Sequence, residues 1–304
     1  MCRVVAYLGH PVLLDDLIFG PDNSLIRQTY APQMLHMLNL GGFGMAAWDA
    51  ASHLAEEPFV YKVTDLPIFD ANLKALAQKL RPHCLLAHVR GVPYSHLSHV
   101  GPDNVHPFRY PGFRLAMAHN GDLAEFSRMK YRLLEHIKPE IARQISGTTD
   151  SEWVYALLMS HVKDPTDKLE PDSILPAVAT TLDILRGVRA QLGISVSSSL
   201  NLFLCDGNDL VATRFTFDFG CYGNTVHEAN LNYLSLWYTI GRDYGYHDEE
   251  WKMVGGPADA DSVIVASEPL TRDVSTWIEV PEYSILYVKT EAGAQTVETI
   301  ELQV

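Results

Sequence analysis

Residues 85–121 read LLAHVRGVPYSHLSHVGPDNVHPFRYPGFRLAMAHNG, and two short apolar runs frame this stretch. The first run, Leu85–Arg90, ends in a positive charge, and the second, Arg114–His119, leads directly into Asn120-Gly121. Apolar runs of this length, bounded by turn-forming residues, are typical of strands in the middle of a sheet. The stretch therefore predicts two buried strands, each with polar residues at its end.

A cysteine stands at the second position of the chain, in the opening Met1-Cys2-Arg3-Val4. Methionine is normally removed ahead of a small residue, so we expect Cys2 to be the mature N-terminus. A single residue would then carry a thiol nucleophile and an α-amine whose reference pKa, about 7.7–8.0, suits a base. The plain alternative is a small apolar residue that begins a buried strand.

The chain resembles the class II glutamine amidotransferases, N-terminal-nucleophile hydrolases that cleave the side-chain amide of glutamine. The resemblance runs from Cys2 to about Val288 and depends on the order of the motifs more than on any one of them. These motifs are Cys2, Ser24–Pro32, Gly42–Trp48, His88-Val89-Arg90, Asn104–Phe108, His119-Asn120-Gly121, Thr148–Glu152, Ala266–Leu270 and Trp277–Pro281.

The resemblance implies that Cys2 attacks a γ-glutamyl amide and forms a thioester. It also implies that the Asn120 side chain and the Gly121 N–H hold the oxyanion. Taken without the resemblance, Asn120-Gly121 is more typical of a turn after a strand. Both interpretations remain open, because a tight turn also presents a backbone N–H.

The same resemblance implies a binding site for the α-carboxylate and the α-ammonium of the substrate. Arg90 would bind the α-carboxylate, for which the guanidinium fork is suited, and Asp150 would bind the α-ammonium. His88, Asn104 and His106 would shape the pocket. The alternatives are a surface arginine at a strand end for Arg90 and a helix N-cap for Asp150.

Patterning alone predicts an α+β protein, and the resemblance implies the four-layer αββα sandwich of this hydrolase type as a single domain over residues 2–304. We expect surface loops at 163–176 and 244–251. We expect helices at 12–19, 70–80 with Asp70 as its cap, 122–137, 150–163 and 176–192, and strands at 3–8, 43–48, 59–63, 85–90, 114–119, 200–205, 210–215, 233–240, 262–266, 276–280 and 284–289.

Composition excludes several classes of function. The net charge of the 304 residues is −14, from 23 basic and 37 acidic side chains, and no basic run occurs, which argues against nucleic acid or an anionic membrane as a partner. No apolar run of about 18 residues and no leader pattern occurs, so we expect no membrane span and a cytoplasmic location. The four cysteines, Cys2, Cys84, Cys205 and Cys221, lack CxxC spacing.

Neither a metal nor a cofactor is implied. His96 and His99 have metal-like spacing, but no carboxylate or thiol cluster accompanies them. The resemblance supplies the nucleophile, base and oxyanion donors from the chain itself. The resemblance assigns no step of the reaction to Ser267 or Glu268. Where many members carry an acidic residue before the glycine-aromatic-glycine stretch, this chain has Leu40-Gly41.

The resulting prediction is a stand-alone γ-glutamyl amide hydrolase that acts on a small molecule and releases glutamate. The short chain is similar to the amidohydrolase of the ergothioneine pathway. Alternatives are breakdown of glutathione or another γ-glutamyl peptide with a partner subunit, and use of free glutamine, which would need a partner protein if ammonia is transferred. Further alternatives are a non-catalytic glutamine or γ-glutamyl sensor and a hydrolase of non-glutamyl amides.

Overall fold

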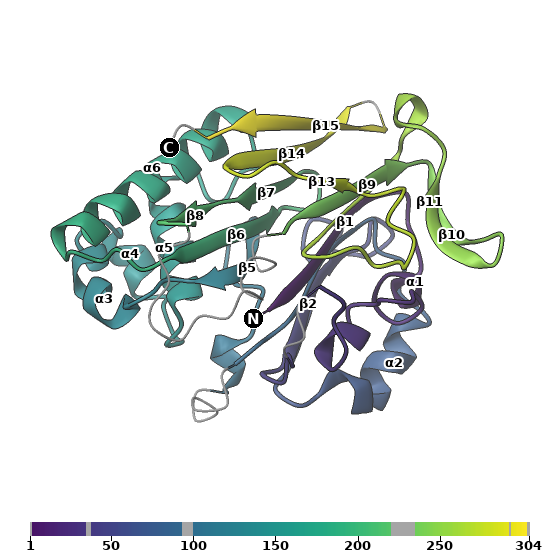
Figure 1. Cartoon of the computed structure of the whole chain (residues 1–304), viewed down its shortest axis with the longest axis horizontal. Coiled ribbons are helices and arrows are strands. Elements are labelled where there is room, and N and C mark those ends of the chain that lie inside the picture. The colour runs from purple at the N-terminus through teal and green to yellow at the C-terminus, as the bar shows by residue number, and fades with distance from the viewer. Residues whose placement is uncertain (1, 35–37, 93–99, 220–234, 292, 303–304) are drawn as a thin grey trace.

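The computed structural model describes residues 2–34, 38–92, 100–219, 235–291 and 293–302, which form two antiparallel sheets between helical layers (Figure 1). The first sheet has the order β13 (Ile278–Glu279), β9 (Trp237–Gly241), β12 (Ser262–Ala266), β1 (Arg3–Gly9), β4 (Cys84–Val89), β2 (Phe43–Trp48) and β3 (Phe59–Val63). The second has the order β15 (Ala294–Glu301), β14 (Ser284–Glu291), β7 (Leu210–Arg214), β6 (Ser198–Cys205) and β5 (Ala116–Asp122), and β8 (Thr216–Phe217) also pairs with β6.

The helices and a hairpin cover the outer faces of the sheets. The hairpin consists of β10 (Asp243–His247) and β11 (Glu250–Val254). The helices are α1 (Leu14–Ile18), α2 (Ala71–Ala77), α3 (Phe126–Leu134), α4 (Pro139–Ala142), α5 (Asp150–His161) and α6 (Pro171–Gln191), with short 3₁₀ turns at Arg27–Thr29, Pro67–Phe69, Pro102–Asn104 and Pro257–Asp259. None of the helices in the described ranges is both long and apolar enough to cross a membrane.

Three apolar cores separate four layers. Side chains of a strand alternate between its two faces, and β1 shows how the first sheet uses this: Val4 and Ala6 lie in the core between the sheets, whereas Val5 and Tyr7 pack with α1 and α2. The second sheet packs its other face on α3, α5 and α6, where α5 supplies residues from Trp153 to Met159. The αββα sandwich is therefore confirmed.

The predicted Asp70 cap and most of the strands are confirmed. Asp70 Oδ1 accepts hydrogen bonds from the N–H groups of Asn72 and Leu73 at the start of α2, each at 3.0 Å. The strands from β1 to β4 and β12 lie within about a residue of their predicted bounds. The edge strand β15 was not predicted, because its polar sequence carries little alternation.

Three predicted segments are wrong. Residues 244–251 form most of the β10–β11 hairpin instead of a loop, because Asp248 and Glu249 both adopt the positive φ of a tight hairpin turn. Helix α6 begins at Pro171, a residue type that fits the first helical position, and it continues through Pro176. The segment 122–137 is helical only from Phe126, because β5 extends to Asp122.

Candidate functional site

The register of β1 brings Cys2 to one end of the space between the sheets. Arg3 lies opposite Val89 of β4, so Cys2 precedes the strand at the end where β4 stops. Cys2 is only 8% exposed. Its Sγ lies 3.4 Å from the Gly91 nitrogen, which donates a hydrogen bond to the sulfur. This contact fixes the sulfur next to the residue that follows Arg90.

Arg90 follows β4 directly and is 8% exposed, so it is not the surface arginine of the alternative interpretation. Two backbone hydrogen bonds fix its position, from its N–H to the Gly42 oxygen at 2.8 Å and from the Gly41 N–H to its oxygen at 2.7 Å. Burial lowers the pKa of the Arg90 guanidinium, and the negative charges of Cys2 and Asp150 oppose that shift. The cation therefore lies within electrostatic range of both groups.

Asn120 and Gly121 lie inside β5, which pairs with β6 through Asn120↔Asn201 and Gly121↔Leu200. The interpretation as a turn between elements is therefore wrong. Asn120 is 1% exposed and its Nδ2 donates to Ser267 Oγ at 2.9 Å. A Cβ on Gly121 would lie 1.9 Å from the Ser199 oxygen, so no larger residue fits between β5 and β6 here.

Asp150 is the first residue of α5, and the N-cap is its neighbour Thr149, whose side chain accepts from the Glu152 N–H. The cap interpretation is therefore wrong by one position. The Asp150 carboxylate accepts from the Leu123 N–H at 2.7 Å and from the Ser151 N–H at 2.8 Å. It thus joins the residue that follows β5 to the start of α5.

His88 and His106 form a buried pair below this end of the sheets. Their ring centroids are 4.0 Å apart, and their exposed fractions are 0% and 2%. Among the described residues, neither ring nitrogen of His106 has a hydrogen-bond partner. Burial, the Arg90 charge and the neighbouring histidines lower the pKa of both rings well below the usual value. Both rings are therefore neutral and support the site through packing.

Histidine burial predicts that the protein loses stability as the pH falls. An unfolded histidine has a pKa of about 6.5, and folding depresses the pKa of His88 and His106. Below pH 6.5 the unfolded chain binds more protons, so the free energy of unfolding falls by up to about 1.4 kcal/mol per histidine per pH unit. Urea unfolding between pH 7.5 and 5 measures the slope. His106→Phe removes one of these protons, and an unchanged slope in that variant would contradict the assignment.

Two further residues support the site, Gly44, which received no role from the sequence, and Asn104, which was expected to shape the pocket. Gly44 lies so close to the His106 backbone that a Cβ would be 2.0 Å from its oxygen, which explains the glycine-aromatic-glycine stretch. The Asn104 side chain bonds both Thr148 Oγ1 and the Thr148 N–H, at 3.0 and 2.8 Å, and so joins two loops.

A buried ion pair lies under the start of β1. Arg3 Nε is 3.6 Å from Glu268 Oε2, and an Arg3 N–H donates to the Cys2 oxygen at 3.0 Å. Glu268 also accepts from Asn23 Nδ2 at 3.2 Å. The segment Ala266–Leu270, which the sequence left without a role, therefore supports the backbone of the predicted nucleophile.

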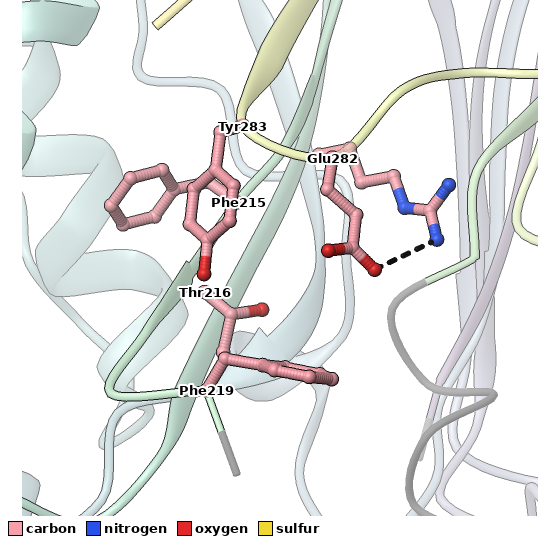
Figure 2. Close-up of a pocket in the computed structure, with 6 residues that line it drawn as sticks. Phe215, Thr216, Phe219, Glu282 and Tyr283 are labelled. Atoms are coloured by element: carbon pink, nitrogen blue, oxygen red, sulfur yellow. Dashed lines mark ion pairs between the residues drawn. The ribbon is translucent and has the colours of Figure 1, made fainter. Parts of the chain in front are cut away.

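A separate small pocket lies on the second sheet, and none of the predicted site residues lines it (Figure 2). Its lining includes Phe219, Tyr283 and Arg214. The guanidinium of Arg214 is 2.8 Å from the Glu279 carboxylate and 3.5 Å from that of Glu282, so two anions already neutralise it. These ion pairs give the arginine a structural role.

In the described ranges, no three His, Cys, Asp or Glu side chains are grouped so that they could hold one ion. His96, His99 and Cys221 lie outside the described residues. Cys84 and Cys205 are free and fully buried in the core between the sheets. Burial and the neighbouring Cys84 raise the pKa of the Cys205 thiol, so neither resembles a reactive cysteine.

Sequence comparison relates the chain to proteins of known family. The family model for class II glutamine amidotransferases matches residues 39–219. The probable glutamine amidotransferase DUG3 of Saccharomyces cerevisiae is 30% identical over 96% of this chain and 82% of its own length. The γ-glutamyl-hercynylcysteine sulfoxide hydrolase of Mycolicibacterium smegmatis is 28% identical over 71% of this chain and 79% of its own length.

Solved structures share the fold. A glutamine aminotransferase class-II domain protein from Silicibacter pomeroyi matches with a TM-score of 0.60 and 22% identity, over 99% of this chain and 100% of that chain. The glutamine phosphoribosylpyrophosphate amidotransferase of Bacillus subtilis matches with a TM-score of 0.59 and 18% identity, over 100% of this chain and 50% of that chain. At these identities the likeness concerns the fold, and it agrees with the four layers.

Proposed function

Because this chain belongs to the class II glutamine amidotransferases, we propose that it is a γ-glutamyl amide hydrolase with Cys2 as its N-terminal nucleophile. Its relatives act on amides, and the chain is an enzyme of that kind. The observation that carries the finer proposal is the meeting of Cys2, Arg90 and Asp150, from three distant segments, at one end of the sheets. A thiol can attack the carbonyl of a γ-glutamyl amide, and a cation and an anion can bind the α-carboxylate and the α-ammonium of the same glutamyl group.

The reaction proceeds in two steps at Cys2. The sulfur attacks the δ-carbonyl of the γ-glutamyl group, while the α-amine of the mature N-terminus takes the thiol proton and passes it to the leaving amine. Water then hydrolyses the thioester, which releases glutamate and restores the thiol. The Gly91 N–H, 3.4 Å from the sulfur, holds the nucleophile in place.

The oxyanion of each tetrahedral intermediate is held by the Asn120 side chain and the Gly121 N–H. Both residues belong to β5, a strand of a packed sheet, so their donors are held in place before the substrate arrives. Preorganised donors of this kind stabilise developing charge without reorganisation during the reaction.

Arg90 and Asp150 bind the two charged groups of the glutamyl end. The guanidinium pairs with the α-carboxylate and the Asp150 carboxylate pairs with the α-ammonium. Each carboxylate oxygen of Asp150 accepts one backbone N–H, from Leu123 and Ser151. A carboxylate has about four acceptor sites. The Ser151 hydroxyl also donates to Oδ1, at 3.3 Å, so one acceptor site remains for an ammonium group, on Oδ2.

Arg90→Ala is expected to raise the KM for γ-glutamyl substrates by about 10- to 100-fold and to change kcat much less. Hydrogen bonds to a charged group contribute about 1.5–3 kcal/mol, and this contact is present in the ground state as well as in the transition state. Steady-state glutamate release measures both constants. Arg90→Lys keeps the charge without the fork and should lie between the wild type and the alanine variant, whereas an unchanged KM would make Arg90 structural.

The proposed function is tested by intact mass together with glutamate release from glutamine, glutathione and a γ-glutamyl thioether, measured side by side. Loss of Met1 with glutamate released from any of them supports the proposal, and the preferred substrate identifies the leaving amine. Selectivity for glutathione would favour γ-glutamyl peptide breakdown, and selectivity for glutamine would favour ammonia transfer to a partner protein. A mature Cys2 without release from any substrate would favour the sensor.

A further inference from the structure

Ser267 extends the ladder between β12 and β1 by one residue, through its side chain. Its N–H donates to the Val4 oxygen at 3.0 Å. The Val4 N–H then donates to Ser267 Oγ at 3.1 Å, in place of the carbonyl that a regular strand would offer. The Ser267 carbonyl instead accepts from Ser235 Oγ at 2.8 Å. The hydroxyl is therefore fixed to the backbone two residues from Cys2.

The same hydroxyl meets the Asn120 side chain across the space between the sheets, at 2.9 Å from Nδ2. Ser267 and Asn120 are 3% and 1% exposed. In this rotamer Asn120 Oδ1 is buried and, among the described residues, has no donor. A buried amide oxygen without a donor costs about 1–3 kcal/mol. An orientation of the Asn120 amide that gives Oδ1 a donor removes this cost.

Rotating the Asn120 amide by half a turn gives a partner both to the Ser267 hydroxyl hydrogen and to Asn120 Oδ1, and it frees the NH₂ group from this contact. A serine hydroxyl has one donor and two acceptor positions. Ser267 Oγ then accepts from the Val4 N–H and donates to Asn120 Oδ1. The Asn120 NH₂ group turns to the side where the unpaired oxygen stood, and its two hydrogens become available to a bound substrate.

We propose that Ser267 is a positioning residue that accepts the Val4 N–H, donates to Asn120 Oδ1 and so aims the Asn120 NH₂ at the oxyanion formed by Cys2 attack. This proposal rests on the oxyanion role proposed for Asn120. It connects three elements, because Ser267 directly follows β12, β1 follows the nucleophile and β5 carries the amide. Ser267 acts through Asn120 and does not itself touch the reacting atoms.

A double-mutant cycle on glutamate release tests this role. Ser267→Ala should lower kcat by about 10- to 100-fold with a KM within about twofold of the wild type, because a misplaced catalytic group costs up to about 10²-fold. In the Asn120→Ala background the same substitution should change kcat by less than about threefold, since the group that it orients is gone. Equal effects in both backgrounds would overturn the proposal.

The matched control is Ser262→Ala. Ser262 is a buried serine at the other end of β12, with its Oγ 3.1 Å from the Tyr7 hydroxyl. Ser262→Ala removes the same hydroxyl oxygen as Ser267→Ala, but from the end of β12 that is far from Cys2. It should therefore lower the urea midpoint and leave kcat unchanged. If Ser262→Ala lowers kcat as much as Ser267→Ala does, the effect is one of strand stability and the positioning role fails.

A second readout does not depend on activity. The side-chain NH₂ signals of Asn120, identified by their loss in Asn120→Ala, should be shifted in Ser267→Ala and unchanged in Ser262→Ala in ¹⁵N spectra. Unchanged Asn120 signals in Ser267→Ala would overturn the contact. If the wild type releases no glutamate but the signals shift as expected, the proposed function fails and the positioning of Asn120 stands.

Discussion

Cys2→Ala is expected to abolish turnover, with kcat reduced by at least about 10⁴-fold, because loss of a covalent nucleophile removes the whole thioester route. The substitution leaves the α-amine and the oxyanion donors intact, together with Arg90 and Asp150, which bind the glutamyl end of the substrate. Folding should be retained, since the sulfur contacts the Gly91 backbone and alanine fits the same buried space. Glutamate release and a urea unfolding curve measure the two effects.

The chain contains its own control for this prediction. An electrophilic glutamine analogue should add once to the wild type, at Cys2, and not at all to Cys2→Ala, as read by intact mass and peptide mapping. Cys84 and Cys205 are 0% exposed, and burial raises the pKa of the Cys205 thiol, so they should stay unmodified. Activity above a few per cent in Cys2→Ala, or labelling of the core cysteines at a similar rate, would remove Cys2 as the nucleophile.

The strand pattern predicted where the site would form. Apolar runs at 85–90 and 114–119 predicted two central strands with polar residues at their ends. The first is β4, which is central in its sheet and is followed directly by Arg90. The second is β5, which is buried but lies at the edge of its sheet and continues through Asn120 to Asp122, so the central position was wrong for this strand. The period of two along β1 explains why Cys2 follows the face of Val4 and Ala6. These features depend on local sequence, which is why the sequence alone could predict them.

The errors came from contacts between distant segments. Asn-Gly is a frequent turn pair, but pairing of β5 with β6 keeps Asn120 and Gly121 in a strand. Asp150 was the predicted cap of α5, but the side chain that accepts from the Glu152 N–H is that of the preceding residue, Thr149. Ser267 acquires its role from Val4 and Asn120, neither of which is near it in the chain.

Asn120→Ala is expected to lower kcat for γ-glutamyl substrates by about 10²–10³-fold, which corresponds to about 2.7–4 kcal/mol of barrier. The donor is needed where charge develops on the carbonyl oxygen, so the loss should fall on kcat and kcat/KM alike while KM stays near the wild-type value. Some catalysis should remain, because the Gly121 N–H is a backbone group that the substitution leaves in place. Steady-state kinetics at saturating and at low substrate concentration separate the two constants.

Asn120→Asp is the matched control, because it has nearly the same shape and replaces the donor by a carboxylate next to a developing negative charge. It should be at least as impaired as the alanine variant, whereas a residue needed only for packing would tolerate it better. Labelling of Cys2 by an alkylating reagent should continue in both variants, since that reaction forms no oxyanion. A rise in KM with unchanged kcat would instead make Asn120 part of the binding surface, and the oxyanion would then depend on Gly121 and a donor still to be found.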